Sequence, residues 1–145
     1  MEAFVLDASV AVSWCFPGDL AEDTLYGREI LALLETSDAI VPEIWPFEVA
    51  NSIFVSFNKR RRISEQQIAD YLQRLKQLPI RVEAYSIWSN VDLEAPARKW
   101  NLSPYDAAYL ALALHKRIPL ATADGDLKNA AAAEGVEVVR TRSIK

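Results

Sequence analysis

The chain has 145 residues, a formal net charge of −4 at pH 7 and a hydrophobic share of 51%. This length predicts one domain over residues 1–145, and the apolar share is sufficient for a sizeable core. Because the net charge is negative, the field of the whole chain does not favour nucleic acid, but a bound divalent cation or a local basic patch allows an acidic protein to act on phosphates.

The single cysteine, Cys15, excludes an internal disulfide and fits a protein of the cytosol. We interpret it as a small buried hydrophobic residue, not as a nucleophile. No uninterrupted apolar stretch is long enough to span a bilayer, and the sequence after Met1 lacks the pattern of a secretory leader. We therefore expect a cytoplasmic protein without a membrane segment.

The first third of the chain alternates strand and helix patterns. Short apolar runs predict strands over residues 3–6 and 39–41, which end at Asp7 and Pro42. A helix is predicted between them, over residues 21–35. Its apolar stripe consists of Leu25, Ile30, Leu33 and Leu34.

Two further helices follow. The first begins near Pro46 and ends in a basic run at 59–62, which complements the helix C-terminus or contacts a nucleic-acid backbone. It places Glu48 on one face with Asn51, which is three residues further along. Ser64 and Gln67 form a capping box at the start of the second helix. The apolar side of that helix consists of Ile68, Leu72, Leu75 and Leu78.

A third strand is predicted over residues 80–85, and a helix over 86–100 that Pro96 interrupts. Asn101 is suited to the left-handed position after this helix. The next helix has Ser103 as its N-cap and Pro104 at its first position. From residue 105 to 114 its only charge is Asp106, so we expect the helix to be buried on all sides.

The remaining chain predicts a fourth strand over residues 120–123, a final helix that ends at Gly135, and a fifth strand over 136–139. The sequence Asp124-Gly125-Asp126 ends the fourth strand. Strands therefore alternate with helices throughout, and this pattern predicts an α/β sandwich with a parallel sheet.

Four acids are expected to converge at one edge of this sheet. Asp7 and Asp124 follow two parallel strands, so both lie at the carboxyl edge, where ligands bind in open α/β sheets. Asp106 opens the helix that leads into the fourth strand, and Glu48 lies in the first turns of the helix after the second strand. Both helix starts belong to the same edge.

Four carboxylates in one place repel each other, which raises some of their pKa values. A hard divalent cation relieves the repulsion, and oxygen ligands without cysteine or histidine favour Mg²⁺ or Mn²⁺. With one histidine and one cysteine in the sequence, a zinc site is not expected. Ser9 and Thr122 each stand two residues from an acid, so their hydroxyls are candidates to orient a carboxylate or a water.

Four motifs occur in an order and spacing that resemble a known family: VLDASV, PEIWPFEVANSI, LSPYDAAYLALA and PLATADGDL. The chain resembles the PIN-domain ribonucleases, most closely the VapC-type toxins of bacterial and archaeal type II toxin–antitoxin pairs. The resemblance covers nearly the whole chain. The one departure is Asn101, where relatives often have glycine, and it lies in a loop.

The resemblance implies that Asp7, Glu48, Asp106 and Asp124 are the catalytic acids and the ligands of Mg²⁺ or Mn²⁺. It assigns supporting roles to Ser9, Asn51, Thr122 and Asp126. Asp126, an occasional fifth acid in the family, is also interpreted as the N-cap of the last helix.

The resemblance further implies a three-layer α/β/α fold with five parallel strands in the order 3-2-1-4-5. The implied activity is endonucleolytic hydrolysis of RNA that leaves a 5′-phosphate and a 3′-hydroxyl. The implied partners are the RNA substrate, a small antitoxin protein and a second copy of the chain in a homodimer. The apolar helix faces over residues 25–34 and 44–57 are candidates for these protein contacts.

Other classes that carry acids on a parallel sheet fit less well. A phosphoacceptor receiver domain requires an Asp after the third strand and a Lys after the fifth, where this chain has Glu83 and Arg140. An Asp-x-Asp phosphatase requires an acid at Ser9, and a dinucleotide-binding module requires a glycine-rich first turn. The alternative that stays open is a non-catalytic PIN module that binds RNA or a protein partner.

Overall fold

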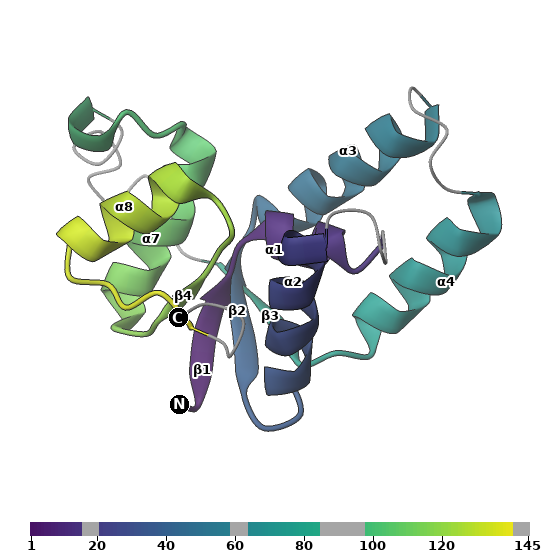
Figure 1. Cartoon of the computed structure of the whole chain (residues 1–145), viewed down its shortest axis with the longest axis horizontal. Coiled ribbons are helices and arrows are strands. Elements are labelled where there is room, and N and C mark those ends of the chain that lie inside the picture. The colour runs from purple at the N-terminus through teal and green to yellow at the C-terminus, as the bar shows by residue number, and fades with distance from the viewer. Residues whose placement is uncertain (16–20, 59–63, 85–97, 141–145) are drawn as a thin grey trace.

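The computed structural model of the chain describes residues 1–15, 21–58, 64–84 and 98–140 (Figure 1). Within these residues, a parallel sheet has the strand order β3-β2-β1-β4, as predicted for the first four strands. The strands are β1 (Ala3–Leu6), β2 (Asp38–Pro42), β3 (Ile80–Glu83) and β4 (Leu120–Ala121).

Strand β1 lies inside the sheet, between β2 and β4. Phe4, Val5 and Leu6 are completely buried. Val5 is opposite Ile40 of β2 and Leu120 of β4. Because parallel strands are usually covered on both faces, their sequences are continuous apolar runs and not alternating patterns. This is why short apolar runs are sufficient to locate the strands in this sequence.

The fifth strand expected over residues 136–139 is reduced to a single parallel bridge between Leu120 and Val138. The amide and the carbonyl of Leu120 both form hydrogen bonds of 2.9 Å to this segment. Strand β4 has two residues, fewer than the expected run at 120–123, so it offers little length for pairing. The segment nevertheless lies beside β4, which is the place that the expected strand order gives it.

Helices cover both faces of the sheet and make three layers, as predicted (Figure 1). On one side are α7 (Pro104–Lys116) and α8 (Gly125–Ala133), and α7 packs against β1, β2 and β4. The other side carries α1 (Ala8–Ser13), α2 (Ala21–Leu33), α3 (Trp45–Asn58) and α4 (Glu65–Lys76).

In α2, the prediction of the buried face is partly wrong. Ile30 and Leu34 are buried as expected, but Leu25 is 42% exposed. Tyr26, four residues before Ile30, is buried in its place because helical spacing puts the two on one face. A Cβ atom at Gly27 would lie 2.2 Å from a side-chain oxygen of α1, so this glycine allows the two helices to approach closely.

Helix α4 has the predicted capping box: the Ser64 hydroxyl accepts the N–H of Gln67 at 3.1 Å, and the Gln67 side chain accepts the N–H of Ser64 at 2.8 Å. Its apolar side is less buried than expected, since Leu72 is exposed. The buried residue of α4 is Tyr71, whose hydroxyl donates to the carbonyl of Ala11 and thereby ties α4 to α1.

Helix α7 begins as the sequence predicts. Asn101 has a left-handed backbone with φ 56°, and the hydroxyl of Ser103 accepts the N–H of Asp106 at 3.1 Å, with a proline at the first helical position. The helix is completely or almost completely buried over residues 107–113. This fixed start determines where Asp106 lies. The expectation of burial on all sides is wrong at the two ends of the predicted stretch, Tyr105 and Leu114.

Cys15 is buried as predicted. Gly135, where the final helix was predicted to end, follows α8 and takes a left-handed backbone. The basic run at 59–62 and the predicted helix break at Pro96 lie outside the described residues. No helix in the described parts of the chain combines the length and the apolar character needed to cross a bilayer.

Candidate active site

The first of the four predicted acids, Asp7, directly follows β1 and is the N-cap residue of α1. Its backbone N–H donates to the carbonyl of Ala121 at 3.0 Å, which ties the carboxyl ends of β1 and β4 together. Its side chain is only 5% exposed and makes no capping hydrogen bond to α1. The carboxylate is held by side chains instead.

Two hydroxyl groups hold the Asp7 carboxylate. Ser9 Oγ donates to Oδ2 at 2.8 Å, and Thr122 Oγ1 donates to the same oxygen at 2.7 Å. Burial raises the pKa of Asp7 above its ordinary value, although both hydrogen bonds act in the opposite direction. The two hydroxyls predicted to orient a carboxylate therefore both do so, but the Thr122 side chain donates to Asp7 and not to its sequence neighbour Asp124.

Asp124 is the N-cap of α8 and is linked to Asp7 through Thr122. Its N–H donates to Thr122 Oγ1 at 3.1 Å, and its Oδ1 accepts the N–H of Asp126 at 3.0 Å. The interpretation of Asp126 as the helix cap is therefore wrong, because Asp124 occupies that position. Asp126 is exposed in the first turn of α8.

Asp106 lies in the first turn of α7 and is partly buried. Its pKa is raised to about 6, first by burial and then by the negative charges of Asp7, Asp124 and Glu48. A carboxylate responds in this way only to charges that are close to it. The four acids, which come from separate elements, therefore form one electrostatic cluster at the carboxyl edge of the sheet. We call these four residues the acid cluster.

Glu48, in the first turn of α3, completes the acid cluster. Burial raises the pKa of Glu48, a hydrogen bond from Tyr109 lowers it, and the charge of Asp7 raises it. The Tyr109 hydroxyl donates to Glu48 Oε1 at 2.5 Å. Tyr109 was not among the predicted site residues, although the sequence carries a signal for it: a tyrosine inside a buried apolar helix needs a partner for its hydroxyl.

Two residues near this site differ from the prediction: Asn51, which was given a supporting role, and Tyr26, which was given none. Asn51 is exposed on α3, and no hydrogen bond joins it to the acid cluster within the described residues. Tyr26 was assigned no role, yet it is almost completely buried beside Asp7, whose charge helps burial to raise the pKa of Tyr26 to about 12. Its hydroxyl donates to the carbonyl of Val139 at 2.8 Å and so ties the C-terminal segment to α2.

The donor chemistry of the acid cluster fits a hard divalent cation. Its donors are carboxylate oxygens, which Mg²⁺ and Mn²⁺ prefer. In the arrangement described, however, no three carboxylate, imidazole or thiol side chains of residues 1–15, 21–58, 64–84 and 98–140 are close enough together to hold one ion. Asp106 and Asp124 are only partly buried, so their side chains have more freedom to move than that of Asp7.

The comparisons with known proteins agree with this fold. A model of the PIN domain matches residues 4–133, which is most of the chain. The chain belongs to the PIN-domain family. Members of this family are typically nucleases, so the resemblance inferred from the four motifs is confirmed at the level of the family. No match to this PIN domain is found among curated proteins.

Among solved structures, this PIN domain is similar to the crystal structure of PAE2754 from Pyrobaculum aerophilum. The TM-score is 0.60 at 16% sequence identity, and the match covers 90% of this chain and 79% of the other. At this identity the similarity concerns the fold alone. It agrees with the parallel sheet and the order of its first four strands.

Proposed function

We propose that this PIN domain is a metal-dependent endoribonuclease that hydrolyses phosphodiester bonds of RNA. The observation that carries the proposal is the acid cluster. Burial, together with the charges of neighbouring acids, raises the pKa values of Asp7, Glu48 and Asp106, and within the described residues no member of the acid cluster has a cationic partner. Buried carboxylates without partners are costly, and a divalent cation is the simplest group that compensates for all four.

Asp7, Asp106, Asp124 and Glu48 would hold the ion, which is Mg²⁺ or Mn²⁺ by the donor set. When bound, such an ion lowers the pKa of a water molecule and neutralises charge on a phosphate. Ser9 and Thr122 keep the Asp7 carboxylate in one orientation, because both hydroxyls donate to the same oxygen. No histidine is required as a base in this scheme.

We extend the proposal to the biological role that the sequence motifs imply, the toxin of a toxin–antitoxin pair. Exposed aromatic residues support protein contacts on α3, where Phe47 and Phe54 are 72% and 59% exposed. A mostly apolar groove of about 250 Å³ runs between α3 and α4 and is lined in part by Phe54 and Leu72. A small antitoxin and a second copy of the chain are the partners we expect for these surfaces.

Cleavage of total small RNA by the purified, partner-free protein tests the activity. Reactions with Mg²⁺, Mn²⁺ or EDTA are compared for the wild type, for Asp7→Asn and for the control Asp38→Asn, which changes an ion-paired acid outside the acid cluster. We expect cuts that require the metal, carry 5′-phosphates, and are absent from Asp7→Asn only. Equal cleavage in EDTA, or by Asp7→Asn, would show that the metal-site assignment is wrong.

One observation favours a second candidate, a PIN module that binds RNA or protein without cleaving it. In the described residues no three potential ligands are close enough to hold an ion as they stand. This candidate would be supported if the folded wild-type protein binds RNA but does not bind Mn²⁺ and does not cleave the RNA. The presence of all four acids favours the enzyme, because a non-catalytic module has no need to keep four mutually repelling carboxylates.

A further inference from the structure

Tyr109 connects two elements that carry members of the acid cluster. It lies on α7, three residues after Asp106, and is completely buried. Its hydroxyl donates to Glu48 Oε1 at 2.5 Å, across 61 residues of sequence. Because α3 and α7 lie in the two layers on opposite sides of the sheet, this hydrogen bond spans the carboxyl edge (Figure 1).

The Tyr109 hydroxyl also lies close to a second member of the acid cluster. Burial raises the pKa of Tyr109 most, and the charges of Glu48 and Asp7 raise it further, whereas the backbone of Ala8 lowers it. Ala8 is the first residue of α1 and directly follows Asp7. The hydroxyl that anchors Glu48 is therefore beside the segment that carries Asp7.

The hydroxyl is not needed to fill the core, since a phenylalanine would supply the same ring. What the hydroxyl adds is a fixed point for Glu48. A glutamate side chain loses considerable rotamer freedom when it is held, and Glu48 is only partly buried, so packing alone does not select one rotamer. With Oε1 bound to a buried phenol, the carboxylate has one anchored oxygen.

We propose that Tyr109 is a positioning residue that holds the Glu48 carboxylate at the acid cluster in the orientation that binds the divalent cation. This inference rests on the proposed metal-dependent function. Tyr109 acts through Glu48 and does not contact the ion or the RNA. Mutation of a group that orients a metal ligand in this way typically weakens metal affinity by about 10- to 100-fold.

The test measures Mn²⁺ affinity by titration calorimetry on the protein without RNA. Tyr109→Phe removes the hydroxyl and keeps the ring, and we expect the Kd for Mn²⁺ to rise about tenfold. Tyr71→Phe is the matched control, because it also removes the hydroxyl of a buried tyrosine. The Tyr71 hydroxyl donates to the backbone carbonyl of Ala11 and not to an acid. We expect its Kd to stay within twofold of the wild type.

A double-mutant cycle separates positioning from a general loss of structure. In a Glu48→Gln background, Tyr109→Phe is expected to change the Kd by less than twofold, because the group on which it acts is already altered. p-Aminophenylalanine at position 109 retains a donor in nearly the same place and is expected to restore most of the affinity. This variant also keeps the test decisive if Tyr109→Phe does not fold.

Each outcome bears on one proposal or on both. If the wild type binds Mn²⁺ and Tyr109→Phe binds it equally well, the positioning role is wrong and the metal-dependent function stands. Equal losses from Tyr109→Phe in the wild-type and Glu48→Gln backgrounds also contradict positioning, as does no recovery with the amino analogue. If the folded wild type does not bind Mn²⁺, the proposed function and this inference fail together.

Discussion

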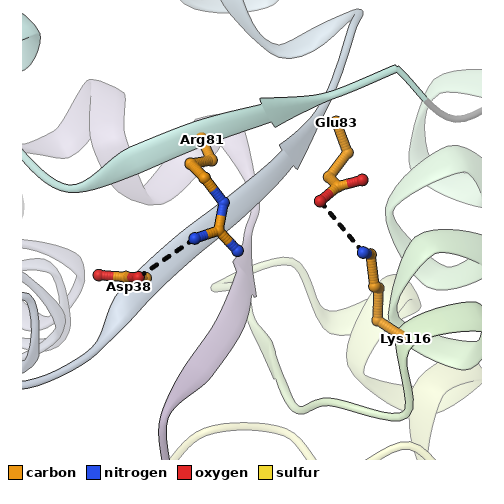
Figure 2. A network of polar contacts seen from close by, with 4 residues as sticks. All are labelled: Asp38, Arg81, Glu83 and Lys116. Atoms are coloured by element: carbon orange, nitrogen blue, oxygen red, sulfur yellow. Dashed lines mark hydrogen bonds and ion pairs between the residues drawn. The ribbon is translucent and has the colours of Figure 1, made fainter.

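Acidic residues are held in two different ways in this molecule. Asp38 on β2 and Glu83 at the end of β3 each form an ion pair, with Arg81 at 3.3 Å and with Lys116 at 3.1 Å (Figure 2). The acid cluster, in contrast, has no ion pair within the described residues. In that part of the chain, the partners of its carboxylates are neutral hydroxyl and amide groups.

The difference indicates what each group of acids does. An ion-paired acid has its counter-charge within the protein, and at the surface such a pair contributes up to about 1 kcal/mol to stability. The acid cluster is instead built at a cost, since burial and mutual repulsion raise the pKa values of Asp7, Glu48 and Asp106. We interpret this cost as the mark of the proposed cation site, whose counter-charge would come from outside the chain.

The largest expected effect is that of Asp7→Asn. The amide keeps an oxygen that can accept from Ser9 and Thr122, but it removes the charge of the most buried acid. We expect RNA cleavage to fall by at least about 1,000-fold. The free energy of unfolding of the metal-free protein should rise by about 1 kcal/mol, because a charge is no longer buried and its repulsion with Asp124 is relieved. Cleavage assays and urea unfolding in EDTA measure the two quantities.

Asp38→Asn is the control for this change, since the same substitution is made at an ion-paired acid. It is expected to leave cleavage unchanged and to lower stability by no more than about 1 kcal/mol. If the two variants shift stability in the same direction, the distinction between the two groups of acids is not supported.

A divalent cation should stabilise the wild type through the acid cluster. A ligand that binds only the folded state at 100 times its Kd adds about 2.7 kcal/mol to the free energy of unfolding. We expect a stabilisation of this size from Mn²⁺ near pH 7, where the carboxylates are ionised, and almost none in Asp7→Asn. Thermal unfolding with increasing Mn²⁺ provides the measurement, with Ca²⁺-free buffer and an ionic-strength control to exclude screening.

The raised pKa of Asp106, about 6, predicts how stability depends on pH without metal. The folded protein holds this proton more tightly than the unfolded chain, so ionisation favours unfolding. The free energy of unfolding in EDTA should therefore fall as pH rises from about 4 to about 6, with little further loss above. Asp106→Asn should reduce this slope, and parallel pH profiles for the two proteins would contradict the assignment.

Much of the fold was predictable because its signals are local. The central strand is a run of completely buried apolar residues, and the starts of α4 and α7 are marked by Ser64 and Ser103, whose side chains accept a backbone N–H as expected. The positions of the four acids after strands or at helix starts also follow from local patterns. Given a parallel sheet, those patterns bring the acids to one edge.

The remaining details depend on contacts between segments that are distant in sequence. Thr122 donates to Asp7 because β1 and β4 are neighbours in a particular register, for which no nearby residue carries a signal. Asp124 and Asp126 are both suitable N-cap residues by type. Which of them caps α8 depends on where the chain leaves β4 and the helix begins, and α8 begins at Gly125. The hydrogen-bond partner of Tyr109 is Glu48, which lies in the other helix layer. The sequence indicates that the buried hydroxyl needs a partner but does not indicate which residue it is.

The smallest expected effect comes from one of the two ion pairs in Figure 2, that of Glu83 and Lys116, which joins the end of β3 to the end of α7. Both side chains are about one-third exposed, so solvent screens the interaction, and Glu83→Gln should lower the free energy of unfolding by about 0.5 kcal/mol. Exchanging the two charges, with Glu83→Lys and Lys116→Glu together, should recover most of this loss. Neither change should alter cleavage or Mn²⁺ affinity, because this acid already has its counter-charge. A loss of Mn²⁺ binding in Glu83→Gln would mean that paired and unpaired acids do not have the separate roles argued above.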